Sequence, residues 1–255
     1  MAETSTTSLP PGAPPAGPQE GRGPPAPTPP LKSDLMRSVG RLIRGLSALF
    51  WGLPLALVVS VQAGSSTWLN VAGPFGSVAP AVAQAVLGYG LWLMSDFQKQ
   101  ERIWILALDR AKLLSLVNLG LAPFLHWHQR MPEVRLFSYA VALLGVSSLF
   151  FLLNLNRVLR RLAAMLPDET LRTETIVFTS LNSGLLMSLP LLLGGLVALA
   201  RLGRLPAYVD LAMRVVGNLQ VWLLLFIGLL PIAITMSLIW KIKETLLESI
   251  FREPG

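Results

Sequence analysis

Long apolar runs separated by short polar segments organise most of the chain. Six runs approach the ~20 residues that an α-helix needs to cross the hydrocarbon core of a bilayer. They fall at about 45–63, 77–96, 105–127, 136–154, 176–200 and 216–240. The pattern therefore predicts an all-α fold: a polytopic transmembrane helix bundle of about six spans, within an integral membrane domain that covers residues 32–255.

The third run is interrupted by charge. Its apolar core, Leu113–Leu125, is too short to cross a bilayer alone. Extending it back to Ile105 brings charged residues into the span, and an i,i+3 pair between Asp109 and Lys112 would limit their cost. The pattern favours this extended span. The alternative is a surface helix over 98–112 followed by a re-entrant Leu113–Leu125.

The two ends of the chain differ from the apolar middle. Residues 1–31 contain ten prolines, a composition that predicts a disordered tail because it cannot bury enough apolar surface to fold. Residues 32–44 place apolar residues at helical spacing among arginines, which predicts an interfacial lead-in to the first span. We expect that span to act as an uncleaved signal anchor. Residues 241–255 predict an amphipathic, cytoplasmic continuation of the last helix.

Basic residues alternate between the predicted loops. Sixteen of the 21 Lys and Arg belong to the N-terminal segment, the second and fourth interhelical segments and the C-terminus, when Arg110 and Lys112 at the start of the third run are counted with the second segment; five fall in the other three loops. Because basic residues are retained on the cytoplasmic side, this bias predicts six spans with both termini inside. Frequent Leu, Ala, Arg, Gly and Pro are also typical of a bacterial inner-membrane protein from a high-GC genome.

A polar hairpin over residues 154–183 lies between the fourth and fifth runs. Arg157, Arg160 and Arg161 fall within little more than one helical turn, and they predict a contact with anionic lipid headgroups or with an acidic partner. The alternative is that they only fix the topology. Pro167 should end this helix, and Asp168 is placed to cap the next one.

Composition excludes several function classes. Charged residues make up 14% of the chain and hydrophobic residues 53%, whereas a soluble domain has about 25% charged residues. The net charge of +7 comes from short clusters at the ends of apolar runs, which argues against a nucleic-acid partner. The chain has no cysteine, so disulfides, thiolate metal sites and cysteine nucleophiles are excluded.

The residues that could carry chemistry are few. His126 and His128 are the only histidines. They are weak metal candidates, because zinc needs three or four ligands and the i,i+2 spacing points them apart on a helix. Neutral amides within the runs form a possible intramembrane polar path. These residues are Asn118, Asn182, Asn218 and Gln220. The alternative is that they only bond helix to helix. We expect no cofactor and no catalytic residue.

Small residues within the runs predict close helix packing. Gly52, Ala56 and Ser60 recur every fourth residue, as do Ser180, Gly184 and Ser188. The sequence Val86–Gly90 is similar to a potassium-channel filter, TVGYG, but it lacks the threonine and interrupts a long apolar run. These glycines therefore predict a helix contact.

The sequence predicts a non-catalytic multi-pass membrane protein, an accessory, assembly or scaffold component of a membrane complex. Its partners would be the lipid bilayer and either another membrane protein or further copies of the chain. The alternative function is a small channel or facilitator for a neutral or weakly polar solute, which the amides and the prolines within the spans would serve.

Overall fold

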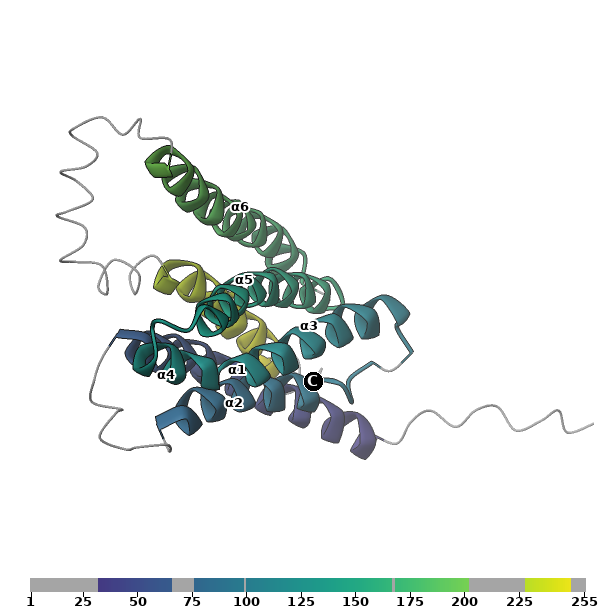
Figure 1. Cartoon of the computed structure of the whole chain (residues 1–255). Coiled ribbons are helices and arrows are strands. Elements are labelled where there is room, and N and C mark those ends of the chain that lie inside the picture. Colours follow the sequence, from purple (N-terminus) through teal and green to yellow (C-terminus); the bar gives the residue numbers. More distant parts are fainter. Residues whose placement is uncertain (1–31, 66–75, 99, 167, 202–227, 249–255) are drawn as a thin grey trace, which may run out of the picture.

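The structure is a computed structural model, and it describes residues 32–65, 76–98, 100–166, 168–201 and 228–248 (Figure 1). Six labelled helices lie in these residues. They are α1 Lys32–Ser65, α2 Val78–Met94, α3 Arg102–Leu121, α4 Pro123–Arg130, α5 Arg135–Ala164 and α6 Glu169–Arg201. A further helix covers 228–248. The described residues contain no β-strand, so the predicted all-α fold is confirmed. The predicted tail 1–31, and the part of the sixth run before residue 228, lie outside the described residues.

Helices α1 and α5 are longer than the apolar runs that predict them. The predicted lead-in is continuous with the first apolar run in α1, and α5 carries the first part of the polar hairpin as far as Ala164. A helix satisfies its backbone hydrogen bonds internally, so it need not end where its apolar run ends. The sequence supplies no strong helix breaker in α5 before Pro167.

The third run forms two helices in succession. Helix α3 is unbroken from Arg102 to Leu121, so no break separates a surface helix from a re-entrant segment. The chain remains helical at Ala122, with φ −55° and ψ −39°, and α4 then starts at Pro123. The break follows from the proline, which has no backbone N–H and clashes with the preceding turn. The predicted Asp109–Lys112 pair is present at 3.5 Å.

Glycines bring α1 and α2 into backbone contact. A Cβ atom added at Gly45 would lie 2.6 Å from the backbone oxygen of Gly90, and one added at Gly52 would lie 2.8 Å from the Leu87 side chain. The two helices therefore pack antiparallel, and only residues without a side chain fit at the Gly45–Gly90 crossing. The predicted helix contact around Val86–Gly90 is confirmed, since this segment lies within α2.

The main core is a leucine-rich seam shared by α1, α2, α3, α5, the first turn of α6 and 228–248. Its largest fully buried side chain is Trp104 of α3. The indole N–H of Trp104 donates to the backbone oxygen of Phe97 at 3.1 Å, so this buried ring keeps a partner for its polar atom. Ile242 and Leu246 also join this core, which docks the predicted C-terminal amphipathic helix onto the bundle.

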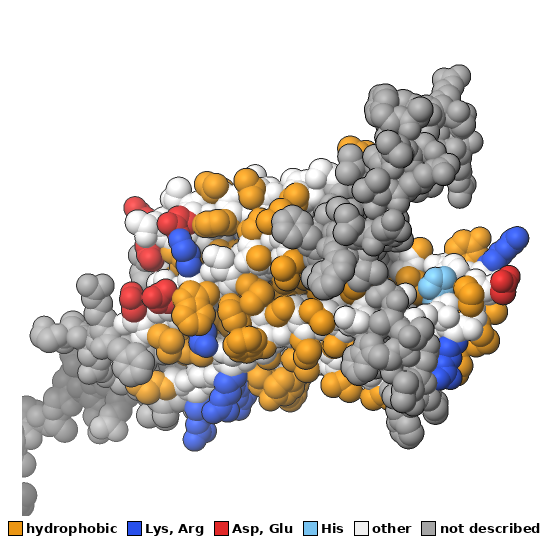
Figure 2. All heavy atoms as spheres, turned by 90° about the vertical axis from the view of Figure 1, so that its left-hand side faces the viewer, with side chains coloured by type: hydrophobic (Ala, Val, Ile, Leu, Met, Phe, Trp, Pro, Cys, Tyr) orange, Lys and Arg blue, Asp and Glu red, His pale blue; other side chains and the backbone are white. Residues whose placement is uncertain are grey.

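Large apolar side chains remain exposed on every long helix, among them Trp51, Trp92, Leu116, Tyr139 and Leu191. Figure 2 shows one face on which hydrophobic side chains fill the middle, while charged side chains gather toward the two ends. Two stretches, Met36–Gly64 and Arg135–Ala164, are long and apolar enough to cross a membrane. Core helices of soluble proteins can share this length and apolar composition.

Candidate functional site

One end of the bundle is joined by ion pairs between helices. Within the described residues there are three of these interhelical pairs, which are Arg41–Asp96, Arg161–Glu101 and Lys241–Glu174. The four predicted cytoplasmic stretches are the N-terminal segment, the second and fourth interhelical segments and the C-terminus. Each pair links one of these stretches to the next along the chain. The participating side chains are 27–53% exposed, so each pair contributes at most about 1 kcal/mol. The pairs therefore fix which helix ends meet more than they stabilise the fold.

The three arginines of the hairpin divide into two kinds. Arg161 donates from Nε and Nη2 to Glu101 Oε1, at 2.8 Å in both cases. Arg157 and Arg160 are exposed on α5 and form no ion pair with any described residue. The structure thus gives Arg161 a role in holding α5 against α3, and it leaves the other two guanidinium groups open to solvent or lipid.

The predicted cap at the start of α6 is confirmed. Asp168 Oδ1 accepts hydrogen bonds from the backbone N–H of Thr170 at 2.9 Å and of Leu171 at 3.3 Å. It also accepts one from the Thr170 hydroxyl at 2.6 Å. The hydroxyl bond is the largest cause that lowers the pKa of Asp168 below its usual 3.8, and the two backbone bonds act in the same direction.

Replacing Asp168 with alanine should remove a stabilisation that depends on pH. Because the folded-state pKa is the lower one, the cap contributes fully above pH 3.8 and loses its contribution as the pH falls through the folded-state pKa. We expect Asp168→Ala to lower the melting temperature of the detergent-solubilised protein by a constant amount near neutral pH. That difference should disappear in acid. An equal difference at all pH values would show that the carboxylate does not act as the cap.

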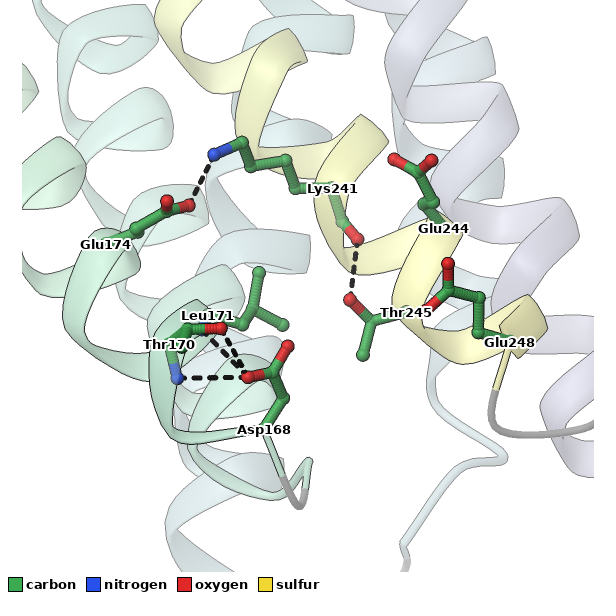
Figure 3. Close-up of a pocket in the computed structure, with 8 residues that line it drawn as sticks. All are labelled: Asp168, Thr170, Leu171, Glu174, Lys241, Glu244, Thr245 and Glu248. Carbon is green, nitrogen blue, oxygen red and sulfur yellow. Dashed lines mark hydrogen bonds and ion pairs between the residues drawn. The ribbon is translucent and has the colours of Figure 1, made fainter. Parts of the chain in front are cut away.

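The cap lies at the edge of an open groove between α6 and 228–248 (Figure 3). The residues that line it are Asp168, Thr170, Leu171, Glu174, Lys241, Glu244, Thr245 and Glu248. Four of these eight are carboxylates, and Lys241 pairs with Glu174 across the groove. This side of the bundle end is therefore acidic, and it is where the C-terminal helix meets the hairpin.

A polar junction inside the bundle joins three helices. Asn182 of α6 donates from Nδ2 to Thr235 Oγ1 at 2.9 Å and to the backbone oxygen of Pro231 at 3.2 Å. Thr235 Oγ1 lies 2.8 Å from the same Pro231 oxygen and 3.3 Å from Oδ1 of Asn156 on α5. The side chains of Asn156, Asn182 and Thr235, which we call the polar junction, are at most 1% exposed.

The polar junction has unused hydrogen-bonding capacity. The Thr235 hydroxyl has one proton, so it can donate to the Pro231 oxygen or to Asn156 Oδ1 but not to both at once. Asn156 Nδ2 and Asn182 Oδ1 have no hydrogen-bond partner among the described residues. All three side chains are neutral at every physiological pH. The junction can therefore hold helices together or bond a polar solute, but it cannot relay protons.

The other predicted polar residues do not join this junction by hydrogen bonds. Asn118 is buried on α3, and its Oδ1 has no hydrogen-bond partner in the described part of the chain. No hydrogen bond between described residues connects it to Asn182. Asn218 and Gln220 lie outside the described residues. The proposed path through all four amides stays a prediction.

The two histidines lie on α4, at the end of the bundle opposite the ion pairs. His126 is fully buried, while His128 is half-buried with Nδ1 3.4 Å from the Ser138 hydroxyl oxygen. Among the described residues, no group of three or more His, Cys, Asp or Glu is placed to hold a metal ion. The assignment of His126 and His128 as weak metal candidates stays a prediction.

Sequence reasoning missed Asn156 and Thr235 of the polar junction. The arginines next to Asn156 indicate a surface segment, although Asn156 itself is buried, one helical turn before Arg160. Thr235 carries a signal that could have been used, because its hydroxyl lies one helical turn after Pro231 in an apolar run.

Comparisons of the chain with family models, with curated proteins and with solved structures found no match.

Proposed function

We propose that the chain is a non-catalytic, multi-pass membrane protein that acts as an accessory, assembly or scaffold component of a membrane complex. The observation that carries this proposal is the distribution of side chains. Large apolar side chains are exposed along every long helix, and charge gathers at the ends (Figure 2). Only 22% of the most apolar window of α5 is buried, whereas the core helix of a soluble protein is mostly buried. Lipid accounts for that exposure.

The proposed topology has six spans with both termini in the cytoplasm, in a bacterial inner membrane. The chain of three ion pairs supports it, because these contacts gather the four basic stretches at one end of the bundle. The positive-inside rule requires that arrangement. Helices α3 and α6 would cross with α1, α2, α5 and the helix that contains 228–248.

Cysteine labelling tests the topology, since the chain has no native cysteine. Glu133 and Ala164 are exposed residues that flank opposite ends of α5. In cells with an intact inner membrane, a membrane-impermeant maleimide should label Glu133→Cys, and it should label Ala164→Cys only after the membrane is disrupted. Labelling of both sites in intact cells would overturn the proposed membrane crossing by α5.

The accessory role is tested by the native mass of the full chain extracted in mild detergent. We expect a stoichiometric second polypeptide to accompany it. Particles that contain this chain alone, whether monomeric or oligomeric, would overturn the accessory role. The control is extraction of an unrelated multi-pass protein from the same membranes under the same conditions, which should not carry that polypeptide.

The polar junction favours a second candidate function, a facilitator for a neutral or weakly polar solute. Buried amide atoms without partners, from Asn156 and Asn182, are groups that such a solute could bond. Solute flux into liposomes is compared between the wild type and the Asn182→Leu variant. If a correctly folded variant carries the same flux as the wild type, the facilitator function is excluded.

A further inference from the structure

Helix α5 carries a continuous exposed stripe along its length. Five large apolar side chains form it, each 49–70% exposed, and they are Leu136, Tyr139, Leu143, Val146 and Phe150. Their spacing of three and four residues places them on one face of the helix. Arg157, which is also exposed, follows Phe150 by seven residues and so lies on the same face, beyond the buried Leu153. Arg160 is exposed as well and lies three residues after Arg157, at the edge of that face.

The length of this stripe matches a bilayer. Arg135 and Arg157 bracket it and are 22 residues apart, which corresponds to about 33 Å of helix. The hydrocarbon core is about 30 Å thick. If the stripe faces acyl chains, Arg157 lies at the depth of the headgroups and Arg160 about 5 Å beyond it. Asn154, between Phe150 and Arg157, donates one N–H of its Nδ2 to the Phe150 backbone oxygen at 2.8 Å, so it enters this zone with that N–H paired.

The carboxylates at this end of the bundle do not engage Arg157 or Arg160, so both remain available to bind a ligand. The carboxylates that pair across helices at this end, on Asp96, Glu101 and Glu174, are engaged by other basic residues. The acidic groove lies between α6 and 228–248 and includes no residue of α5. Arg157 and Arg160 therefore present two exposed guanidinium groups, one helical turn apart, at the depth where lipid phosphates lie.

We infer that Arg157 and Arg160 bind the phosphate groups of anionic lipid at the cytoplasmic face, while Arg161 positions α5 against α3. A guanidinium group suits this task because its planar fork of N–H donors matches phosphate oxygens. The apolar stripe above it holds the acyl chains of the same lipids. This inference rests on the proposed membrane topology, and it selects two of the three hairpin arginines on structural grounds.

Lipid retention by the full chain tests this inference. We would reconstitute the wild type and Arg157→Gln/Arg160→Gln into vesicles of phosphatidylcholine mixed with phosphatidylglycerol, extract them gently, and count the retained lipids by mass spectrometry. The wild type should be enriched in phosphatidylglycerol. In the double variant, the enrichment of phosphatidylglycerol should fall by about fivefold for each arginine removed. Equal enrichment in both proteins would overturn the inference.

Two further variants keep the test decisive. Arg135→Gln removes one isolated arginine from the opposite end of α5, so it should lower the enrichment less than the double variant, which removes two guanidinium groups one helical turn apart. Arg157→Lys/Arg160→Lys keeps the charge and should restore much of the preference, which separates lipid binding from misfolding. If the double Gln variant instead loses a copurifying acidic polypeptide and keeps its phosphatidylglycerol, a protein partner occupies this surface and the lipid inference fails.

A wrong membrane topology can be distinguished from a wrong lipid-binding role for Arg157 and Arg160. If labelling of Glu133→Cys and Ala164→Cys shows that α5 does not cross the membrane, the proposed function and this inference both fall. If α5 crosses and the lipid preference is absent, only the role of Arg157 and Arg160 is overturned.

Discussion

Replacing Gly45 with leucine should separate α1 from α2 and destabilise the protein by about 3 kcal/mol, the upper part of the usual range for overpacking. A Cβ atom at this position would lie 2.6 Å from the backbone oxygen of Gly90. A side chain could rotate out of the way, but a helix backbone cannot, so the two helices must move apart. Contacts along the shared seam, including Gly52 with Leu87, would then be lost as well.

Gly40 supplies a matched control on the same helix. A Cβ atom added there meets no atom within 4 Å. Gly40→Leu should be neutral or should stabilise by up to about 1 kcal/mol, because glycine is the poorer helix former. Thermal unfolding of both variants in the same detergent compares them directly. Equal melting temperatures would show that α1 and α2 do not cross at Gly45 and Gly90.

Replacing Asn182 with leucine should cost about 1–3 kcal/mol, as expected when buried polar groups lose a partner. Leucine has the same number and branching of side-chain heavy atoms as asparagine, so the packing of α6 is largely kept. The change removes the N–H donor to Thr235 Oγ1 and to the Pro231 backbone oxygen. Reversible unfolding in mixed micelles measures the loss.

A double-mutant cycle with Thr235→Val isolates the bond itself. We expect a coupling free energy of about 0.6–1.7 kcal/mol, the range found for polar contacts between membrane helices. Asn154→Leu is the control, because the Asn154 amide bonds only to its own helix, at the Phe150 oxygen. A coupling free energy of zero would show that Asn182 and Thr235 do not meet.

Apolar periodicity located the helices because each run had to be buried or covered by lipid along its length. It could not locate the ends of α1 and α5, since a helix that leaves an apolar medium keeps its backbone hydrogen bonds. The break at Pro123 was not predictable from the proline alone, because α1 and α6 continue unbroken through Pro54 and Pro190. Helix α5 extends past its apolar run and carries Arg157 to Arg161 on the same helix as the apolar stripe, because no helix breaker occurs between the two.

The partners of individual polar residues were less predictable. The sequence marks Arg157, Arg160 and Arg161 as equivalent, and only the position of α3 beside α5 shows that Arg161 alone of the three meets Glu101. The polar junction likewise depends on three helices meeting at one depth. That depth is set by helix register, which long-range packing determines and local sequence does not.

The order of the ion pairs has a consequence for biogenesis. Arg41 meets Asp96, Glu101 meets Arg161, and Glu174 meets Lys241, so each predicted cytoplasmic stretch is tied to the stretch made just before it. A ribosome releases the chain from its N-terminus onward, and early segments fold while later ones are still being made. In the proposed membrane topology, each newly inserted hairpin would find its electrostatic partner already in place, and no stretch would wait for a distant one.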